Sequence, residues 1–196
     1  MKIIGITGGV GAGKSTVLGL LKEICRCEII MADDVAKELM AGGGILSQDA
    51  IRLFGSDAYL SDNSLNTRHI AEIMYGNPAV KKEWTSLVHP AVNKEIARRI
   101  ERASKKPECE YVFIEAALLI ENNYDKICDE IWYIYADKEE RIKRLKESRG
   151  YSREKSESII KNQLGHEDFM QKCDFVIDNG ISVDDTKKQL ENKLEE

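Results

Sequence analysis

Five short apolar runs, rich in β-branched and aromatic residues, alternate with longer segments whose apolar residues recur at helical spacing. The runs occupy residues 2–7, 27–31, 111–115, 130–135 and 174–177. Because they are almost continuously apolar, each run is predicted to be a strand that is buried on both faces. Such strands, separated by helices, predict a three-layer α/β fold around a parallel sheet of about five strands.

The segment between the second and third runs is much longer than a crossover helix requires. Its helical patterns cover residues 33–41, 46–54, 67–75 and 78–103. Gly42-Gly43-Gly44 marks a flexible joint, and His89-Pro90 is expected to interrupt the last pattern. We therefore predict that residues 33–107 form a helical subdomain inserted into the α/β core.

A second helical stretch, residues 138–164, is strongly charged and is divided at Gly150. Its arginines cluster at Arg141, Arg144, Arg149 and Arg153. The charges fit a solvated helix pair, and they fit equally well a mobile lid that brings arginines over phosphates. We take residues 138–164 as a lid. The core then consists of residues 1–32, 108–137 and 165–196, the last of which ends in a charged helix.

A glycine-rich motif follows the first predicted strand and fits G-x-x-x-x-G-K-[ST] at every fixed position. It comprises Gly8, Gly9, Val10, Gly11, Ala12, Gly13, Lys14, Ser15 and Thr16. The glycines let backbone N–H groups surround phosphate oxygens, and the following helix adds the positive end of its dipole. Lys14 is expected to reach the β- and γ-phosphates, and the Ser15 hydroxyl to ligate Mg²⁺. This motif predicts a P-loop NTPase fold that binds a nucleoside triphosphate; a glycine-rich turn that binds nothing is the alternative.

Composition narrows the class of protein further. The chain has 42% hydrophobic and 32% charged residues, which is typical of a globular domain, and its net charge of −5 argues against nucleic acid as a partner. No apolar run approaches the roughly 18 residues of a membrane helix. The chain runs from Met1 directly into the first strand, so we expect no signal peptide and a cytoplasmic location. The five cysteines are scattered without a CxxC pair, which favours reduced thiols over a metal site.

The reaction class depends on what accompanies the P-loop. A guanine-specific GTPase is expected to carry N-K-x-D, but Asn93-Lys94 is followed by Glu95-Ile96 and Asn192-Lys193 by Leu194-Glu195. An inserted subdomain and an arginine-rich lid favour a kinase, which needs an acceptor site, charge neutralisation and exclusion of water.

Further motifs occur in order along nearly the whole chain. They are Gly5-Ile6-Thr7-Gly8 through Ser15, Ala32-Asp33 with Ala36, Arg68, His89-Pro90, Leu118-Leu119 with Glu121, Arg144-Leu145, Arg149, Gln163, and Asp174 through Asn179. In this order and spacing the chain resembles the dephospho-coenzyme A kinase family. The resemblance implies Mg²⁺-dependent transfer of the ATP γ-phosphate to the ribose 3′-hydroxyl of dephospho-CoA, which gives coenzyme A and ADP in the last step of coenzyme A biosynthesis.

Three positions depart from the family pattern. Met31 stands where the family has the first of two aspartates, Glu115-Ala116-Ala117 replaces its D-x-P, and Arg141 replaces a glutamine common at the start of the lid. We expect these changes to affect the fine positioning of the substrate more than the reaction class.

The resemblance implies a catalytic role for Lys14, Asp33 and Arg144. Asp33 is the implied general base for the acceptor hydroxyl; an N-cap of the following helix is the alternative. Arg144 and Arg149 are implied to contact the ATP phosphates and the transferred group. Surface pairing of these arginines with nearby glutamates is the alternative.

The remaining implied site residues concern the acceptor, the metal and the adenine. Arg68 and His89 resemble acceptor-pocket positions, although His89 could equally be a structural histidine. Glu115 and Leu118 are expected on the substrate side, with Glu115 either a second-shell magnesium acid or a structural acid. Asn179 falls where adenine would rest, or it forms a turn.

Two other functions remain open at this point. A nucleoside or nucleoside-monophosphate kinase shares the P-loop, the insert and the lid. A regulatory nucleotide binder with little turnover is a third possibility, which Met31 keeps open. The expected partners are ATP and dephospho-CoA, without nucleic acid or membrane, and the chain is expected to be a monomer or a weak homo-oligomer.

Overall fold

The computed structural model describes residues 1–116, 119–120, 122 and 124–196. The chain divides into two units. The first consists of Met1–Ile30 and Ala103–Glu196, and the second of Met31–Arg102. The prediction that residues 33–107 form a separate substrate-binding subdomain remains a prediction.

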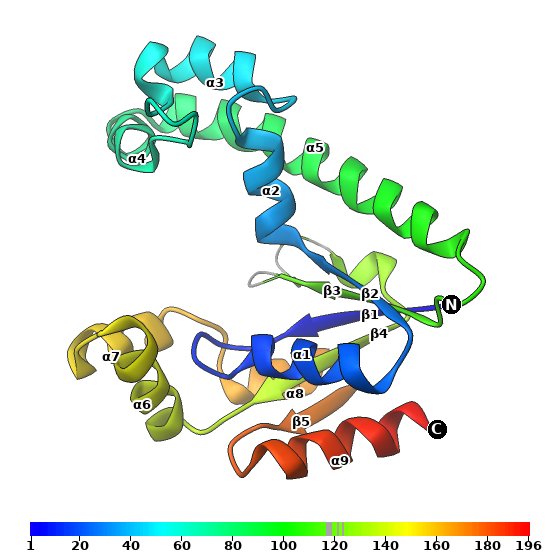
Figure 1. The fold of residues 1–196 in the computed structure, drawn as a ribbon. Helices are drawn as coiled ribbons and strands as arrows, with labels where there is room; N and C mark the ends of the chain where they lie inside the picture. Colours follow the sequence, from blue (N-terminus) through cyan, green and yellow to red (C-terminus); the bar gives the residue numbers. More distant parts are fainter. Residues whose placement is uncertain (117–118, 121, 123) are drawn as a thin grey trace. The chain divides into compact units, whose positions relative to one another are not determined.

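The first unit is built on a five-stranded parallel sheet in the order β2-β3-β1-β4-β5 (Figure 1). The strands are β1 (Lys2–Thr7), β2 (Cys27–Met31), β3 (Tyr111–Glu115), β4 (Glu130–Tyr135) and β5 (Phe175–Asp178). Four strands have the predicted bounds, and β5 lies one residue later than its apolar run. The predicted α/β fold with a parallel sheet is confirmed.

The register of the sheet aligns the carboxyl ends of its strands. Ile6 of β1 pairs with Glu115 of β3, and Tyr135 of β4 pairs with Asp178 of β5. Each of these residues is at or next to the last residue of its strand. The loops that follow β1, β3, β4 and β5 therefore leave the sheet at one edge, which is where parallel α/β sheets carry their sites.

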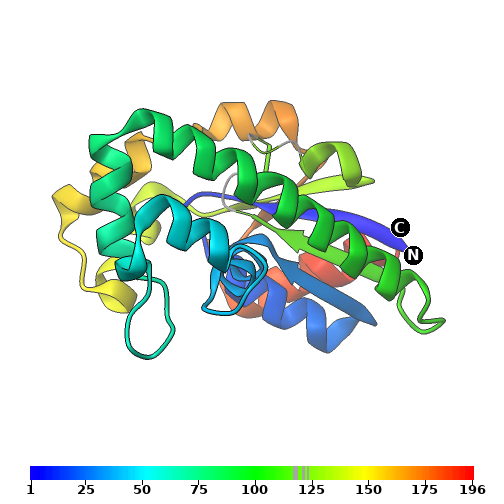
Figure 2. The same cartoon turned by 90° about the horizontal axis from the view of Figure 1, so that it is seen from above.

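Helices cover both faces of this sheet. α1 (Lys14–Ile24) and α9 (Val183–Leu194) lie together on one face, while α8 (His166–Lys172) and the short helix η2 (Tyr124–Ile127) lie on the other (Figure 2). The hydrophobic pattern did not predict α8. Its seven residues bury only Phe169, which stacks on Tyr133 of β4 at a ring-centre distance of 4.5 Å, so it has no apolar period to detect.

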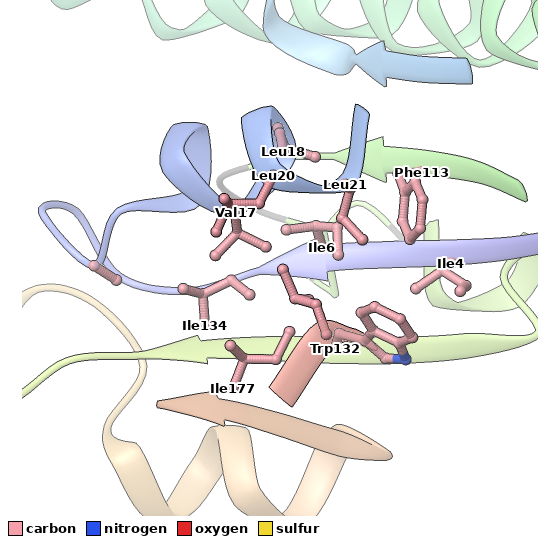
Figure 3. Close-up of a cluster of buried hydrophobic side chains, with 12 residues drawn as sticks. Ile4, Ile6, Val17, Leu18, Leu20, Leu21, Phe113, Trp132, Ile134 and Ile177 are labelled. Carbon is pink, nitrogen blue, oxygen red and sulfur yellow. The ribbon is translucent and has the colours of Figure 1, made fainter. Parts of the chain in front are cut away.

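The main core lies between the sheet and the α1–α9 layer (Figure 3). Apolar residues of α1 meet those that point out of one face of β1, β3, β4 and β5. The cluster comprises Ile4, Ile6, Ala12, Val17, Leu18, Leu20, Leu21, Phe113, Trp132, Ile134, Ile177 and Leu190. Ala12 belongs to the P-loop, so this core also anchors the loop.

The charged stretch after β4 forms two helices within the first unit. They are α6 (Lys138–Arg149) and α7 (Arg153–Lys161). Gly150 separates them as predicted, because it adopts a left-handed conformation (φ 64°) that ends α6. Ser152 then accepts a hydrogen bond from the Lys155 amide and begins α7.

The second unit is helical. Its elements are α2 (Ala32–Met40), α3 (Ser47–Phe54), the short helix η1 (Ser56–Ala58), α4 (Thr67–Gly76) and the part of α5 (Pro78–Ser104) up to Arg102. Phe54 and Trp84 meet edge to face at 5.3 Å and centre a separate apolar cluster. α5 continues through His89-Pro90, where we expected an interruption. Pro90 is exposed and removes one helical hydrogen bond, and burial of residues such as Trp84 and Val92 on either side holds the helix together.

Among the described residues, no helix combines the length and apolar character that crossing a membrane requires.

Replacing Ile6 tests whether the β1 face anchors the fold. Ile6 is completely buried in the main core, so Ile6→Ala is expected to lower the free energy of unfolding by about 2–5 kcal/mol, and Ile6→Val by about 0.5–1.5 kcal/mol. Urea unfolding followed by circular dichroism measures both values. Equal losses for the two variants would contradict a packing role that scales with the removed volume.

Candidate active site

The P-loop links the end of β1 to the start of α1, and its path depends on glycines. Gly8, Gly11 and Gly13 have φ values of 150°, 78° and 90°, which residues other than glycine rarely adopt. A Cβ atom on Gly8 would lie 2.5 Å from the Ile134 carbonyl oxygen, and one on Gly13 would overlap the side-chain amide of Asn179. The loop is therefore held closely by β4 and by the segment after β5.

The N-terminus of α1 is arranged to accept an anion. Gly13 is the N-cap residue, makes no side-chain cap, and is followed by a first turn without an acidic residue. The first N–H groups of any helix lack partners within the helix and carry the positive end of its dipole. Ser15 and Thr16 of this turn are exposed. These features suit an anion such as a phosphate group at the helix terminus.

Lys14 contacts oxygen atoms of the P-loop and of β3. Its Nζ donates a hydrogen bond to the Gly8 carbonyl oxygen at 2.9 Å and lies 3.6 Å from Oε1 of Glu115. Glu115 is buried at the end of β3, and the pairing of β3 with β1 brings it there. The sequence predicted both residues, but their ion pair appears only in the folded sheet.

The oxygen donors present fit a magnesium ion. Ser15 and Glu115 offer a hydroxyl and a carboxylate, which are the hard ligands that Mg²⁺ prefers, and Mg²⁺ is commonly bound by one or two protein oxygens together with substrate phosphates. The described residues contain no group of three or more His, Cys, Asp or Glu side chains suited to a metal. A metal bound mainly through the nucleotide matches this donor set.

Arg144 and Asn179 bind the outer side of the P-loop. Arg144 Nη1 donates to the Ala12 carbonyl oxygen at 3.2 Å, and its Nη2 donates to the Asn179 carbonyl oxygen at 2.7 Å. Asn179 Nδ2 donates to the same Ala12 oxygen at 2.8 Å, while its Oδ1 accepts from Thr186 at 2.9 Å. Arg144 also pairs with Glu140 at 2.9 Å. The surface pair that we considered as an alternative thus exists beside a contact with the loop.

Arg141 and Gln163 bind the tip of the loop. Arg141 Nε donates to the Val10 carbonyl oxygen at 2.8 Å, and its Nη2 donates to Gln163 Oε1 at 2.8 Å. The Val10 amide donates to the same Gln163 oxygen at 3.0 Å. Burial lowers the pKa of Arg141. The sequence analysis counted Arg141 among the lid arginines and Gln163 among the family motifs but gave neither an individual role, although Arg141 lies about one helical turn before Arg144 on the same side of α6.

The other lid arginines lie elsewhere. The Arg149 guanidinium is 6.0 Å from the centre of the Tyr151 ring. Arg153 binds both carboxylate oxygens of Glu139 at 2.9 and 2.6 Å and also pairs with Glu157 at 3.3 Å. These exposed pairs match the interpretation of α6 and α7 as a solvated helix pair. The two helices therefore carry a charged surface as well as two arginines, Arg141 and Arg144, that contact the P-loop.

The predicted acceptor-side residues belong mainly to the second unit. Asp33 is an exposed residue in the first turn of α2, whose N-cap is Met31, so Asp33 is not the cap that we considered. Arg68 is exposed and pairs with Glu72 at 3.1 Å. His89 is also exposed, which argues against a structural histidine.

An open groove on α5 includes His89. Its other lining residues are Pro78, Lys81, Lys82, Thr85, Ser86 and Pro90. The groove therefore offers two ammonium groups, two hydroxyls and an imidazole to a ligand. Leu118, which the sequence analysis placed on the substrate side, lies outside the described residues.

The fold and the site define a P-loop kinase. A crystal structure of a Thermus thermophilus protein matches with a TM-score of 0.81 at 27% identity, over 99% of this chain and 96% of that one. Dephospho-CoA kinase from Campylobacter jejuni matches with a TM-score of 0.72 at 21% identity, over 98% and 95%, and shikimate kinase from Acinetobacter baumannii with 0.55 at 18%, over 100% and 94%. The last two share the fold.

Sequence comparison identifies the family. The family model for dephospho-CoA kinase matches residues 2–185. Dephospho-CoA kinase of Carboxydothermus hydrogenoformans is 33% identical over 97% of this chain and 91% of its own length, and that of Streptococcus mutans is 33% identical over 98% and 96%. The chain belongs to the dephospho-CoA kinase family, and the resemblance seen in its motifs is confirmed.

Gly13→Ala tests the close approach at the phosphate site. The positive φ alone is expected to cost about 1–2 kcal/mol of stability, and the overlap with Asn179 adds to this loss and weakens nucleotide binding. Gly19→Ala is the matched control, because Gly19 is an exposed residue inside α1 whose added Cβ meets nothing within 4 Å. It is expected to stabilise the protein by about 1 kcal/mol. Urea unfolding and nucleotide titration compare the two; similar behaviour would contradict the predicted constraint at Gly13.

Proposed function

We propose that this protein transfers the γ-phosphoryl group of ATP to the ribose 3′-hydroxyl of dephospho-CoA, giving coenzyme A and ADP. The observation that carries the phosphoryl-transfer part is the P-loop at the end of β1, with Lys14 held between Gly8 and Glu115. The choice of acceptor rests on membership of the dephospho-CoA kinase family. ATP with Mg²⁺, a cytoplasmic location and a monomeric or weakly oligomeric state belong to the same proposal.

On the donor side, the residues act by position and charge. The amides at the start of α1 and the Lys14 ammonium bind the β- and γ-phosphates, where charge is redistributed as the bond to the leaving ADP breaks. The Ser15 hydroxyl would hold Mg²⁺ together with the nucleotide, and the ion would supply further charge neutralisation. Glu115 holds Lys14 in place, and Arg144 adds a positive charge at the outer side of the loop.

On the acceptor side, Asp33 orients the 3′-hydroxyl and takes its proton as the new O–P bond forms. Because Met31 replaces the family's other aspartate, Asp33 carries this role alone. The exposed side chains of Arg68 and His89, together with the lysines of the α5 groove, bind the anionic part of the acceptor. Arg149 binds the nucleotide phosphates in a closed lid, and Asn179 lies beside the adenine; an acceptor-side role for Leu118 rests on the family alone.

The proposal is tested by measuring ADP release with a panel of acceptors. Dephospho-CoA is expected to support turnover that AMP, CMP and nucleosides do not, and mass spectrometry should find coenzyme A as the product. Turnover with AMP or CMP alone would establish a nucleoside-monophosphate kinase. Nucleotide binding without turnover on any acceptor would establish a regulatory binder.

Lys14→Ala is expected to reduce the rate of coenzyme A formation by about 100- to 1,000-fold, because it removes one preorganised charge from the transferred phosphoryl group. Lys22→Ala is the matched control, since Lys22 is an exposed lysine in the last turn of the same helix. Steady-state kinetics with thermal unfolding of each variant separates lost catalysis from lost fold. Near-normal turnover of Lys14→Ala would exclude the proposed donor site.

Asp33→Asn is expected to lower kcat by about 100- to 10,000-fold while leaving the Kd for ATP almost unchanged, because it removes the base without changing side-chain size. Asp34→Asn is the matched control: Asp34 is the next carboxylate of α2 and pairs with Lys37 at 2.8 Å. If both variants keep full activity, the acceptor hydroxyl is activated by another group.

A further inference from the structure

The backbone of Val10, at the tip of the P-loop, is held at both its N–H and its C=O group. Its amide donates to Gln163 Oε1 at 3.0 Å, and its carbonyl oxygen accepts from Arg141 Nε at 2.8 Å. Arg141 Nη2 closes the ring by donating to the same Gln163 oxygen at 2.8 Å. Three hydrogen bonds thus join Val10, Arg141 and Gln163 in one cycle, and the charged guanidinium of Arg141 donates two of them.

The loop is shaped to receive Arg141. A Cβ atom on Gly9 would overlap the guanidinium group, and one on Gly11 would lie 2.9 Å from the Arg141 carbonyl oxygen. Arg141 therefore lies directly against the backbone of the tip on both sides of Val10. The Arg141 side chain is half-buried, so its hydrogen bonds are less exposed to water than surface contacts are, and the same burial lowers the pKa of its guanidinium.

The two side chains come from opposite ends of the charged helical segment. Arg141 is in the first turn of α6. Gln163 lies just after the C-cap residue of α7, and its backbone N–H donates to the Ile160 carbonyl oxygen at 3.2 Å. The cycle therefore fastens both ends of the α6–α7 segment to the backbone of one residue of the loop. A phosphate-binding loop works through amides that already point at the phosphates, and an unfastened glycine-rich tip would lose entropy each time a nucleotide bound.

We propose that Arg141 and Gln163 are positioning residues for the nucleotide: together they brace the backbone of Val10, keep the P-loop tip in its phosphate-accepting shape, and link the lid to the donor site. Neither side chain needs to touch the nucleotide for this role. The proposal rests on the donor half of the proposed function and is independent of the acceptor.

Direct titration with ATP, without any acceptor, tests the brace. Arg141→Ala and Gln163→Ala are each expected to raise the Kd for ATP about tenfold, the loss that follows from a charge-assisted hydrogen bond. Because each residue acts through the other, the double variant is expected to bind ATP about as weakly as either single variant, and not about a hundredfold more weakly than the wild type.

Two controls keep charge loss and fold loss apart from the brace. Lys146→Ala removes an exposed cation from the same helix as Arg141, and Gln171→Ala removes an exposed glutamine from α8; both are expected to leave the Kd for ATP unchanged. Thermal unfolding monitors the fold of each variant. If Arg141→Ala is not folded, Arg141→Lys replaces it, since a single ammonium cannot reproduce the paired donation to Val10 and Gln163.

Unchanged ATP affinity in both single variants would overturn the brace, and so would independent, multiplicative losses in the double variant. A wild-type protein that does not bind ATP would overturn both the brace and the donor half of the proposed function. Coupled losses of ATP affinity in a protein that phosphorylates no dephospho-CoA would support the brace and overturn the proposed acceptor.

Discussion

The structure of the first unit depends on how closely other groups approach the P-loop backbone. The glycines of this loop leave no Cβ atom to keep neighbours away, so Arg141 and Asn179 lie directly against it. Carbonyl oxygens that the loop turns outward, such as that of Ala12, are then satisfied by side chains from α6 and the segment after β5. A buried carbonyl without such partners would be costly, and this requirement explains why residues more than 130 positions away hold the loop.

The parallel sheet supplies the second half of the site. Since β3 lies beside β1 in register, Glu115 ends next to the start of the loop and pairs with Lys14. A buried carboxylate beside a lysine is stable only when each neutralises the other. The same ion pair holds the Lys14 ammonium near the N-terminus of α1 before any phosphate binds there. The core that packs α1 on β1 fixes both partners, so packing and electrostatics reinforce each other.

The second unit has a hydrophobic core separate from that of the sheet. It has its own apolar cluster around Phe54 and Trp84, and it exposes polar side chains such as those of Asp33, Arg68 and His89. A separate core lets these side chains stay exposed without weakening the sheet unit.

Local sequence determined most elements and the donor motif. β1 and the P-loop were predictable because an apolar run, glycines and Lys14 are adjacent in the chain, and their roles follow from local geometry. The brace of Arg141 and Gln163 on Val10 was not, because charged and polar side chains on an amphipathic helix look alike in sequence whether they face water or a backbone. α8 also escaped prediction, since its one buried residue leaves no periodic signal. Only the tertiary structure decides such features, because hydrogen bonds between distant segments depend on packing that no local pattern records.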